Sequence, residues 1–235
     1  MSVIHALANY ASGGLSGVQA SQRDWSPYLV HFTDSKAMKP LRSAIKKGLT
    51  PKDIEVALKK ADDTSFGTVE KICKSRELWA RSPSERDQIP ECVCLSECTI
   101  SGLISHAERY GRFGFVFEKL AIAKAGGAPC LYLLRDDYTR ISKAFKGSDK
   151  GAENERVWGL ANLLEPAGLN QGKGKKRRKV QDFTHEREWR VFQALDLKKL
   201  PPVALLAPSA HVSRVGDLGL ELPVIPIDVL HSWGA

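Results

Sequence analysis

The segment Tyr110-Gly-Arg-Phe-Gly-Phe-Val-Phe117 decides the fold class, because it predicts a glycine turn that leads into a strand. Phe113, Phe115 and Phe117 alternate with other residues, so they lie on one face of that strand and belong to the core. Helical patterns separate the expected strands without the regular alternation of a doubly wound sheet, so we expect an α+β fold. The other expected strands lie at 28–33, 92–95, 129–134, 186–195, 203–206 and 224–227.

Length and composition favour a single domain. The chain has 235 residues, of which 43% are hydrophobic and 26% charged, as in ordinary globular proteins. We expect one domain over 1–235, with an N-terminal arm at 1–26 and a basic, partly flexible insert at 146–182. No run approaches the ~18 apolar residues of a membrane span, and the N-terminus lacks the basic region and apolar core of a signal peptide. We therefore expect a cytoplasmic protein with no membrane partner.

Five cysteines fit a reducing compartment, since their number is odd and no signal peptide is evident. Three of them lie in Cys92-Val-Cys-Leu-Ser-Glu-Cys98, a cluster that invites comparison with zinc sites. Zinc sites usually show two separated pairs of ligands, and no second pair follows here. Cys92 and Cys94 share a face of the expected strand, where small buried hydrophobic residues are the better interpretation.

The formal net charge of +8, with a sequence pI near 9.3, favours anionic partners and nucleic acid above all. Six cations fall in the run Gly172-Lys-Gly-Lys-Lys-Arg-Arg-Lys179. This run is either a solvated loop or a contact to the phosphate backbone of DNA or RNA, with an affinity that falls steeply with salt. The candidate nucleic-acid-binding residues are Lys173, Lys175, Lys176, Arg177, Arg178 and Lys179.

Four common enzyme signatures are absent from the sequence: the P-loop, the Rossmann glycine fingerprint, the His-Glu-x-x-His zinc motif and the Gly-x-Ser-x-Gly elbow. Three separated segments carry the residues that can do chemistry. They are Tyr28-Leu-Val-His-Phe-Thr33, Cys94-Leu-Ser-Glu97 with the later Tyr110–Phe117 strand, and Thr184-His-Glu-Arg-Glu-Trp-Arg-Val191.

In this order and at these intervals, the three segments resemble the ADP-ribosyltransferase superfamily, and more closely the AbiGi-like abortive-infection proteins of bacterial phage resistance. The features that carry the resemblance are the His-Phe-Thr strand, the Cys-x-Ser-Glu segment, the Tyr-Gly-x-x-Gly strand and the late Glu-x-Glu-Trp-Arg strand. They cover residues 28–190 and leave the basic insert unmatched. The resemblance implies split mixed and antiparallel sheets with flanking helices, NAD as cofactor, and transfer of ADP-ribose to nucleic acid or protein.

The resemblance also implies that Glu188 is the catalytic carboxylate and that Glu186 assists it. Departure of nicotinamide from NAD leaves a ribosyl oxocarbenium ion, which a neighbouring carboxylate stabilises. Side chains alternate along a strand, so Glu186 and Glu188 share a face and can divide the roles of ionised stabiliser and proton acceptor. The alternative is an edge strand on which solvated glutamates pair with Arg187 and Arg190.

Four further residues are expected to bind the cofactor. The resemblance places His31 and Thr33 against an NAD ribose. It places Tyr110 against the nicotinamide ring and Ser96 at the cofactor. The alternative for His31 is a hydrogen-bonded structural histidine, and the alternative for Thr33 is the N-cap of the helix that follows. Glu97 is expected only to cap the next helix.

Three hypotheses follow for the function. The first is an ADP-ribosyltransferase toxin of phage defence or of a toxin–antitoxin system, with nucleic acid as the favoured acceptor. The second is a non-catalytic antitoxin or regulator of the same fold that binds a cognate toxin, since AbiGi-type proteins are described as antitoxins. The third is a metal-dependent nuclease, which is disfavoured because no second acidic cluster accompanies Glu186 and Glu188. The expected core residues are Leu29, Ile45, Leu58, Val93, Leu95, Phe115, Phe117, Leu131, Leu133, Trp189 and Val191.

Overall fold

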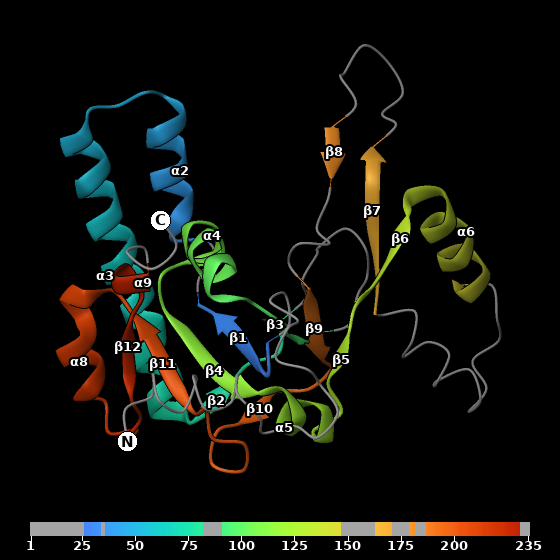
Figure 1. Ribbon diagram of the computed structural model, residues 1–235. Helices are drawn as coiled ribbons and strands as arrows, with labels where there is room; N and C mark the ends of the chain where they lie inside the picture. Colours follow the sequence, from blue (N-terminus) through green and yellow to red (C-terminus); the bar gives the residue numbers. More distant parts are fainter. Residues whose placement is uncertain are drawn as a thin grey trace.

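The computed structural model describes residues 26–33, 36–81, 91–146, 163–170, 179–181 and 187–230. Its centre is a seven-stranded sheet with the order β12-β11-β4-β1-β3-β9-β5 (Figure 1). Neighbouring strands run antiparallel except for the parallel pair β11 and β12. The α+β expectation is therefore confirmed. The strands are β1 (Tyr28–Phe32), β3 (Val93–Ser96), β4 (Gly114–Glu118), β5 (Ala128–Pro129), β9 (Glu188–Val191), β11 (Ala204–Ala207) and β12 (Val224–Pro226).

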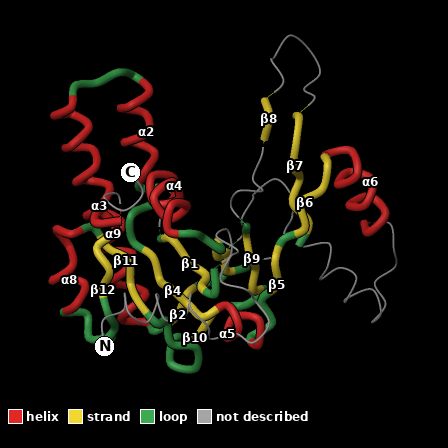
Figure 2. The backbone as a smooth tube through the Cα atoms, viewed as in Figure 1, coloured by secondary structure: helices red, strands yellow, loops and turns green. Residues whose placement is uncertain are grey.

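Helices lie around this sheet and beside a smaller second sheet (Figure 2). They are α2 (Met38–Lys46), α3 (Pro51–Ser75), α4 (Ile100–Tyr110), α5 (Lys119–Lys124), α6 (Arg135–Lys146), α8 (Val212–Gly216) and α9 (Ile227–Leu230), with a short 3-10 turn η2 (Ser209–His211). No helix among the described residues has both the length and the apolar character needed to span a membrane.

The aromatic strand forms the middle of the sheet, as its sequence predicts. β4 pairs with β1 over five residues, and Phe113, Phe115 and Phe117 are completely buried. Gly114 permits the close approach of the two strands, because a Cβ at this position would lie 2.7 Å from Cγ1 of Val30. The strand that decides the fold class is thus aromatic and buried at four of its five positions.

Alternation along the strands divides the interior into two cores on opposite faces of the sheet. On one face, Leu29 and Phe115 pack in the same cluster as Phe66 and Val69 of α3. On the other face, Val30 packs in a cluster that includes residues of α4 and α9. The helices therefore bury both faces, and the residues of β1 contribute to both cores.

Helices α2 and α3 form a hairpin that projects beyond the sheet (Figure 1). Gly48, two residues after the end of α2, has a φ of +65°, and the N–H groups of Gly48 and Leu49 donate to the carbonyls of Ile45 and Ala44. α3 begins after Thr50, whose hydroxyl accepts from Asp53 N–H at 3.3 Å. α3 runs unbroken for 25 residues.

A second sheet extends away from the first beside α6 (Figure 2). It contains β6 (Leu131–Leu134), β7 (Leu164–Asn170) and β8 (Lys179–Gln181), with β6 and β7 parallel and β7 and β8 antiparallel. Two of its strands fall within the expected insert at 146–182, so part of that insert is regular structure. A small ladder joins β2 (Glu77–Leu78) to β10 (Leu195–Asp196). The expected N-terminal arm lies almost wholly outside the described residues.

Six of the expected core residues are buried, two at the periphery are exposed, and the remaining three, Leu58, Leu133 and Trp189, are half-buried. Ile45 is 55% exposed and Leu131 is 51% exposed. Ile45 lies at the end of α2 beyond the part that packs on α3, and Leu131 opens β6 outside the main sheet. Apolar character alone does not show how far an element projects from the core. The expected core residues that are buried are Leu29, Val93, Leu95, Phe115, Phe117 and Val191.

Candidate active site

Three strands that the sequence singled out are neighbours in the sheet. Val30 of β1 lies opposite Ser96 of β3, and Ser96 lies opposite Glu188 of β9. Residues in register across a sheet point to the same face, so Ser96 and Glu188 stand side by side on the face that carries Val30. Two of the predicted site residues, 92 positions apart in the chain, are thus brought together.

His31 lies at the seam between β1 and β3. The two strands are paired only at Val30 and Ser96, and the half-buried His31 bonds the Cys94 carbonyl through Nδ1 at 2.8 Å. A carbonyl can only accept, so Nδ1 carries the proton and Nε2 of the neutral ring is an acceptor. Burial lowers the pKa of His31, partly offset by the Cys94 carbonyl. Side chains alternate along β1, so His31 belongs to the sheet face opposite Glu188. Its imidazole therefore adjoins the site only at the seam between the two strands.

Glu188 is held by a buried arginine two residues along the same strand. Arg190 Nε lies 3.1 Å from Glu188 Oε1, and its Nη2 lies 3.0 Å from Glu188 Oε2. The same Nη2 lies 2.6 Å from Oε2 of Glu165, at the start of β7. Burial opposes the charge of Arg190, but the two carboxylates raise its pKa above the ordinary value. The carboxylate of Glu188 is therefore fixed in orientation by a guanidinium that is 2% exposed.

Arg190, Glu188 and Glu165 form a triad of paired charges. This triad agrees in part with the alternative interpretation of Glu188 as a glutamate that pairs with a neighbouring arginine. The pairing with Arg190 is as that alternative expected, whereas the edge strand is wrong because β9 lies between β3 and β5. Arg187 pairs with Glu97 at 2.8 Å. Its backbone has a φ of +43°, which separates it from the regular strand that begins at Glu188. Glu186 lies outside the described residues.

Glu97 is a buried carboxylate that the sequence did not identify as such. Its oxygens lie 2.8 Å from Arg187, 3.0 Å from Lys119 Nζ, and 3.4 Å from both Trp189 Nε1 and the Ser26 amide. The expectation that Glu97 caps the next helix is wrong. The hydroxyl of Thr99 caps α4 instead, accepting from Gly102 N–H at 3.2 Å. The four donors come from distant parts of the chain, so no local pattern announces the cluster.

Tyr110 ends α4 on the same side of the sheet as Val30. Its ring centroid lies 5.8 Å from that of His106, which stacks on Phe32 at 5.9 Å. Arg109 lies over the Tyr110 ring at 5.2 Å. Tyr110 is half-buried, and it belongs to the layer that covers the Glu188 face near β1.

Thr33 is buried and bonds to the neighbouring strand. It is 1% exposed, and both its backbone N–H and its hydroxyl donate to the Phe113 carbonyl, at 2.9 and 3.4 Å. The alternative that Thr33 caps the following helix is wrong, because α2 begins at Met38 after Ala37, which forms no side-chain cap. Thr33 instead extends the pairing of β1 with β4 by one residue.

The cysteines cluster beside Arg190. The Sγ atoms of Cys92 and Cys94 lie 3.7 Å apart, which confirms that the two side chains share a face. Their contact lowers the pKa of Cys92 and raises that of Cys94, whose burial and the nearby Glu188 act in the same direction. Cys130 is buried close by, and burial raises the pKa of its thiol. The described residues contain no group of three potential ligands that could hold a metal ion.

The predicted nucleic-acid residues fall between β7 and β8. Only Lys179 is described, as the first residue of β8. The others lie outside the described residues, namely Lys173, Lys175, Lys176, Arg177 and Arg178.

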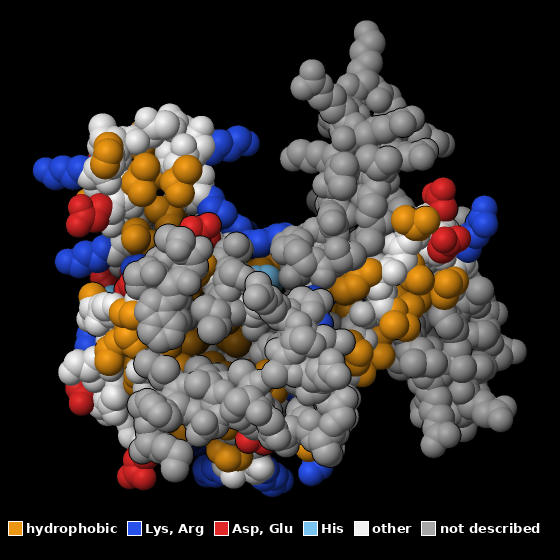
Figure 3. Space-filling view, viewed as in Figure 1, with side chains coloured by type: hydrophobic (Ala, Val, Ile, Leu, Met, Phe, Trp, Pro, Cys, Tyr) orange, Lys and Arg blue, Asp and Glu red, His pale blue; other side chains and the backbone are white. Residues whose placement is uncertain are grey.

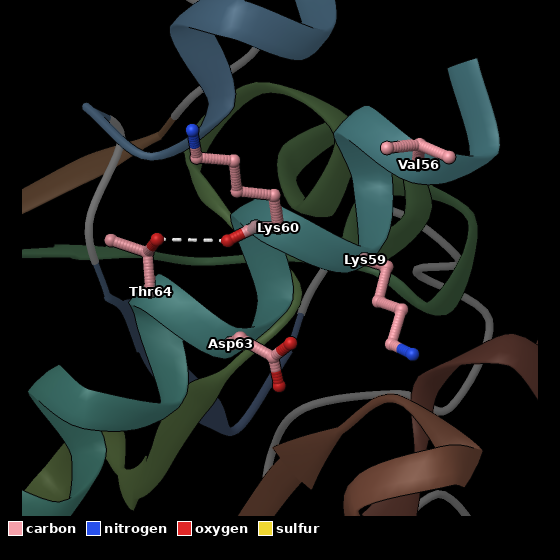
Figure 4. A pocket seen from close by; sticks show the side chains of 5 residues that line it. All are labelled: Val56, Lys59, Lys60, Asp63 and Thr64. Atoms are coloured by element: carbon pink, nitrogen blue, oxygen red, sulfur yellow. Dashed lines mark hydrogen bonds between the residues drawn. The ribbon is translucent and has the colours of Figure 1, made fainter. Parts of the chain in front are cut away.

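An open depression follows one face of α3, away from the three strands (Figure 4). Thr64 on its wall donates its hydroxyl to the Lys60 carbonyl at 2.8 Å, and Asp63 pairs with His211 and Arg214. The Thr64 hydroxyl and the Asp63 carboxylate are thus engaged within the helix or with neighbouring elements. Its lining residues are Val56, Lys59, Lys60, Asp63 and Thr64.

Comparison with protein-family models, with curated proteins and with solved structures finds no match to this chain. The fold and site thus define an α+β protein in which a fixed carboxylate and a hydroxyl stand together on one sheet face beside a neutral histidine.

Proposed function

We propose that the chain is an NAD-dependent ADP-ribosyltransferase with an ADP-ribosyltransferase-like fold, acting in bacterial phage defence or a toxin–antitoxin system. The observation that supports it is the order of the strands β1, β3 and β9, which carry His31, Ser96 and Glu188. The resemblance drawn from the sequence requires these three segments to be neighbours, and they are.

The residues present fit a dinucleotide in their chemistry. Glu188, held by its ion pair with Arg190, would stabilise the positive charge that develops on the ribose as the bond from C1′ to nicotinamide breaks. Ser96, next in register, offers a hydroxyl that can bond the ribose. Nε2 of His31, at the seam between β1 and β3, is left as an acceptor because Nδ1 already donates to the Cys94 carbonyl. Tyr110 supplies an aromatic ring for stacking on nicotinamide.

Nucleic acid is the acceptor that the charge favours. The chain carries +8 overall, and its most basic run joins β7 to β8. Transfer would form a bond from ribose C1′ to a nucleophilic base atom, whose proton passes to a carboxylate or to water.

The direct test is incubation of the purified chain with labelled NAD and DNA, RNA or protein acceptors. We expect transfer that falls about 100-fold or more in Glu188→Gln, since a preorganised charge is lost. Glu165→Gln is the matched control, because it also removes one carboxylate from Arg190 but has no role at the ribose. Activity within about fivefold of the native chain is expected for this control, and thermal melts of both variants check that they fold.

Absence of both transfer and NAD hydrolysis by the folded native chain would overturn the proposal. Equal losses in Glu188→Gln and Glu165→Gln would also count against it, since the two then act only through Arg190.

A second candidate is a non-catalytic antitoxin or regulator of the same fold. It is favoured by the contacts of Arg190 with both carboxylate oxygens of Glu188, which give that residue a sufficient structural role. This candidate predicts no NAD binding by calorimetry and a stable complex with the product of a neighbouring gene on coexpression. Calorimetric NAD binding that Ser96→Ala weakens would refute it.

A further inference from the structure

Helix α2 presents a row of cations to solvent. Lys39, Arg42 and Lys46 recur at intervals of three and four residues, so they share one face of the helix. The opposite face carries Met38, Leu41 and Ala44, which are buried, the first two in a cluster with residues of α3. All three basic side chains are exposed, and blue side chains project from the hairpin in Figure 3.

The hairpin is far more basic than the rest of the chain. Residues 36–60 contain eight Lys and Arg and two acidic residues, and the run at 172–179 contains six further cations. These two segments together carry more than the whole net charge of +8, so the remainder of the chain is net acidic. A charge divided in this way orients an approaching polyanion toward the two basic segments.

Three acids of α3 contact residues outside α2. Asp53 accepts from the Thr50 hydroxyl at 2.6 Å at the start of the helix. Asp62 is buried and pairs with Arg112. Asp63 faces His211 and Arg214 on the other side of the helix. Glu55 is exposed, and this one acid cannot balance the six cations at 36–52.

We propose that the exposed face of α2, defined by Lys39, Arg42 and Lys46 with the adjoining Lys36 and Lys47, is a docking surface for the sugar-phosphate backbone of nucleic acid. Seven residues of helix separate Lys39 from Lys46, or about 10 Å, a span of roughly three nucleotides. Flexible lysines contact phosphates by charge and do not read sequence, so the surface positions the nucleic acid without selecting its bases. The surface extends the proposed function by naming where an acceptor docks.

The observations favour nucleic acid over a lipid bilayer. A helix that lies on a membrane inserts its apolar face, and the apolar face of α2 is already packed on α3. Three exposed apolar residues do occur near the hairpin tip, Ile45, Leu49 and Val56. They flank the turn, whereas Met38 and Leu41 of α2 are buried in the cluster with residues of α3.

The test measures binding alone, so it stands apart from any result on transferase activity. Fluorescence anisotropy of the full chain with a labelled 20-nucleotide single strand and a 20-base-pair duplex is recorded between 50 and 200 mM salt. The variant is Lys39→Gln with Lys46→Gln and Lys47→Gln, all on exposed positions. The matched control is Lys71→Gln with Lys74→Gln and Lys198→Gln, which removes the same charge from exposed positions away from α2.

We expect the α2 variant to bind at least about tenfold more weakly at 100 mM salt, with a salt slope lower by about two to three. The control should change affinity less than about threefold. The proposal is overturned by equal effects of variant and control, by no nucleic-acid binding of the native chain, or by binding that is lost only when the run at 172–179 is neutralised. Preferential binding of the native chain to phosphatidylserine vesicles, lost in the α2 variant, would assign the surface to membranes and also overturn it.

Discussion

Replacement of Arg190 by methionine should destabilise this protein more than any single change to its carboxylate partners. Methionine keeps much of the length and apolar packing of arginine but leaves Glu188 and Glu165 buried without a counter-charge. Their side chains are 13% and 19% exposed, so water does little to compensate. Breaking a buried pair by removing one partner costs about 3–5 kcal/mol, and here one cation serves two carboxylates.

Glu188→Gln should cost much less, about 1 kcal/mol. The amide oxygen still accepts from Arg190, and Glu165 still balances its charge at 2.6 Å. Urea unfolding followed by tryptophan fluorescence measures both changes. With an m value of about 3 kcal/mol per M, the loss in Arg190→Met moves the midpoint by about 1–1.7 M, and that in Glu188→Gln by about 0.3 M.

Arg187→Met is the control for this comparison. Its guanidinium is 36% exposed, and Glu97 retains Lys119 at 3.0 Å after the change, so we expect a loss of about 1 kcal/mol or less. The argument from charge balance is refuted if Arg190→Met loses no more stability than Arg187→Met or Glu188→Gln.

Three further changes test separate parts of the fold. Gly127→Ala should lose about 1–3 kcal/mol in urea unfolding, because the new Cβ would lie 2.5 Å from Cγ2 of Ile122; an unchanged midpoint would contradict this packing. Thr50→Ala should lose about 1 kcal/mol, since the Asp53 amide loses its cap, whereas Thr50→Ser should retain it. His31 has a folded-state pKa below its unfolded value, so the unfolded chain binds more protons and stability falls as the pH drops through and below about 6.5. His31→Gln should reduce that pH dependence between pH 7.5 and 5.5, and an equal slope in both proteins would contradict the assignment.

The sequence by itself determined the local elements and the class of fold. Phe113, Phe115 and Phe117 alternate with a period of two, and this pattern predicts a strand with one buried aromatic face wherever the strand lies. Thr50-Pro51 and Gly48 fix a helix start and a helix end through bonds to residues a few positions away. These helix ends can be predicted without knowledge of the fold, because the groups that bond to each other are close in the chain.

Only the tertiary structure decided what the charged residues do. Glu188 and Arg190 are two residues apart, but the third member of their triad, Glu165, comes from another strand 25 residues away. Glu97 finds the indole of Trp189 across 92 residues, and His31 finds the Cys94 carbonyl across 63. The sequence does not distinguish a strand carboxylate that faces solvent from one that faces a cation or a substrate. Its surroundings are set by which strands pair, and that pairing depends on the burial of the whole sheet.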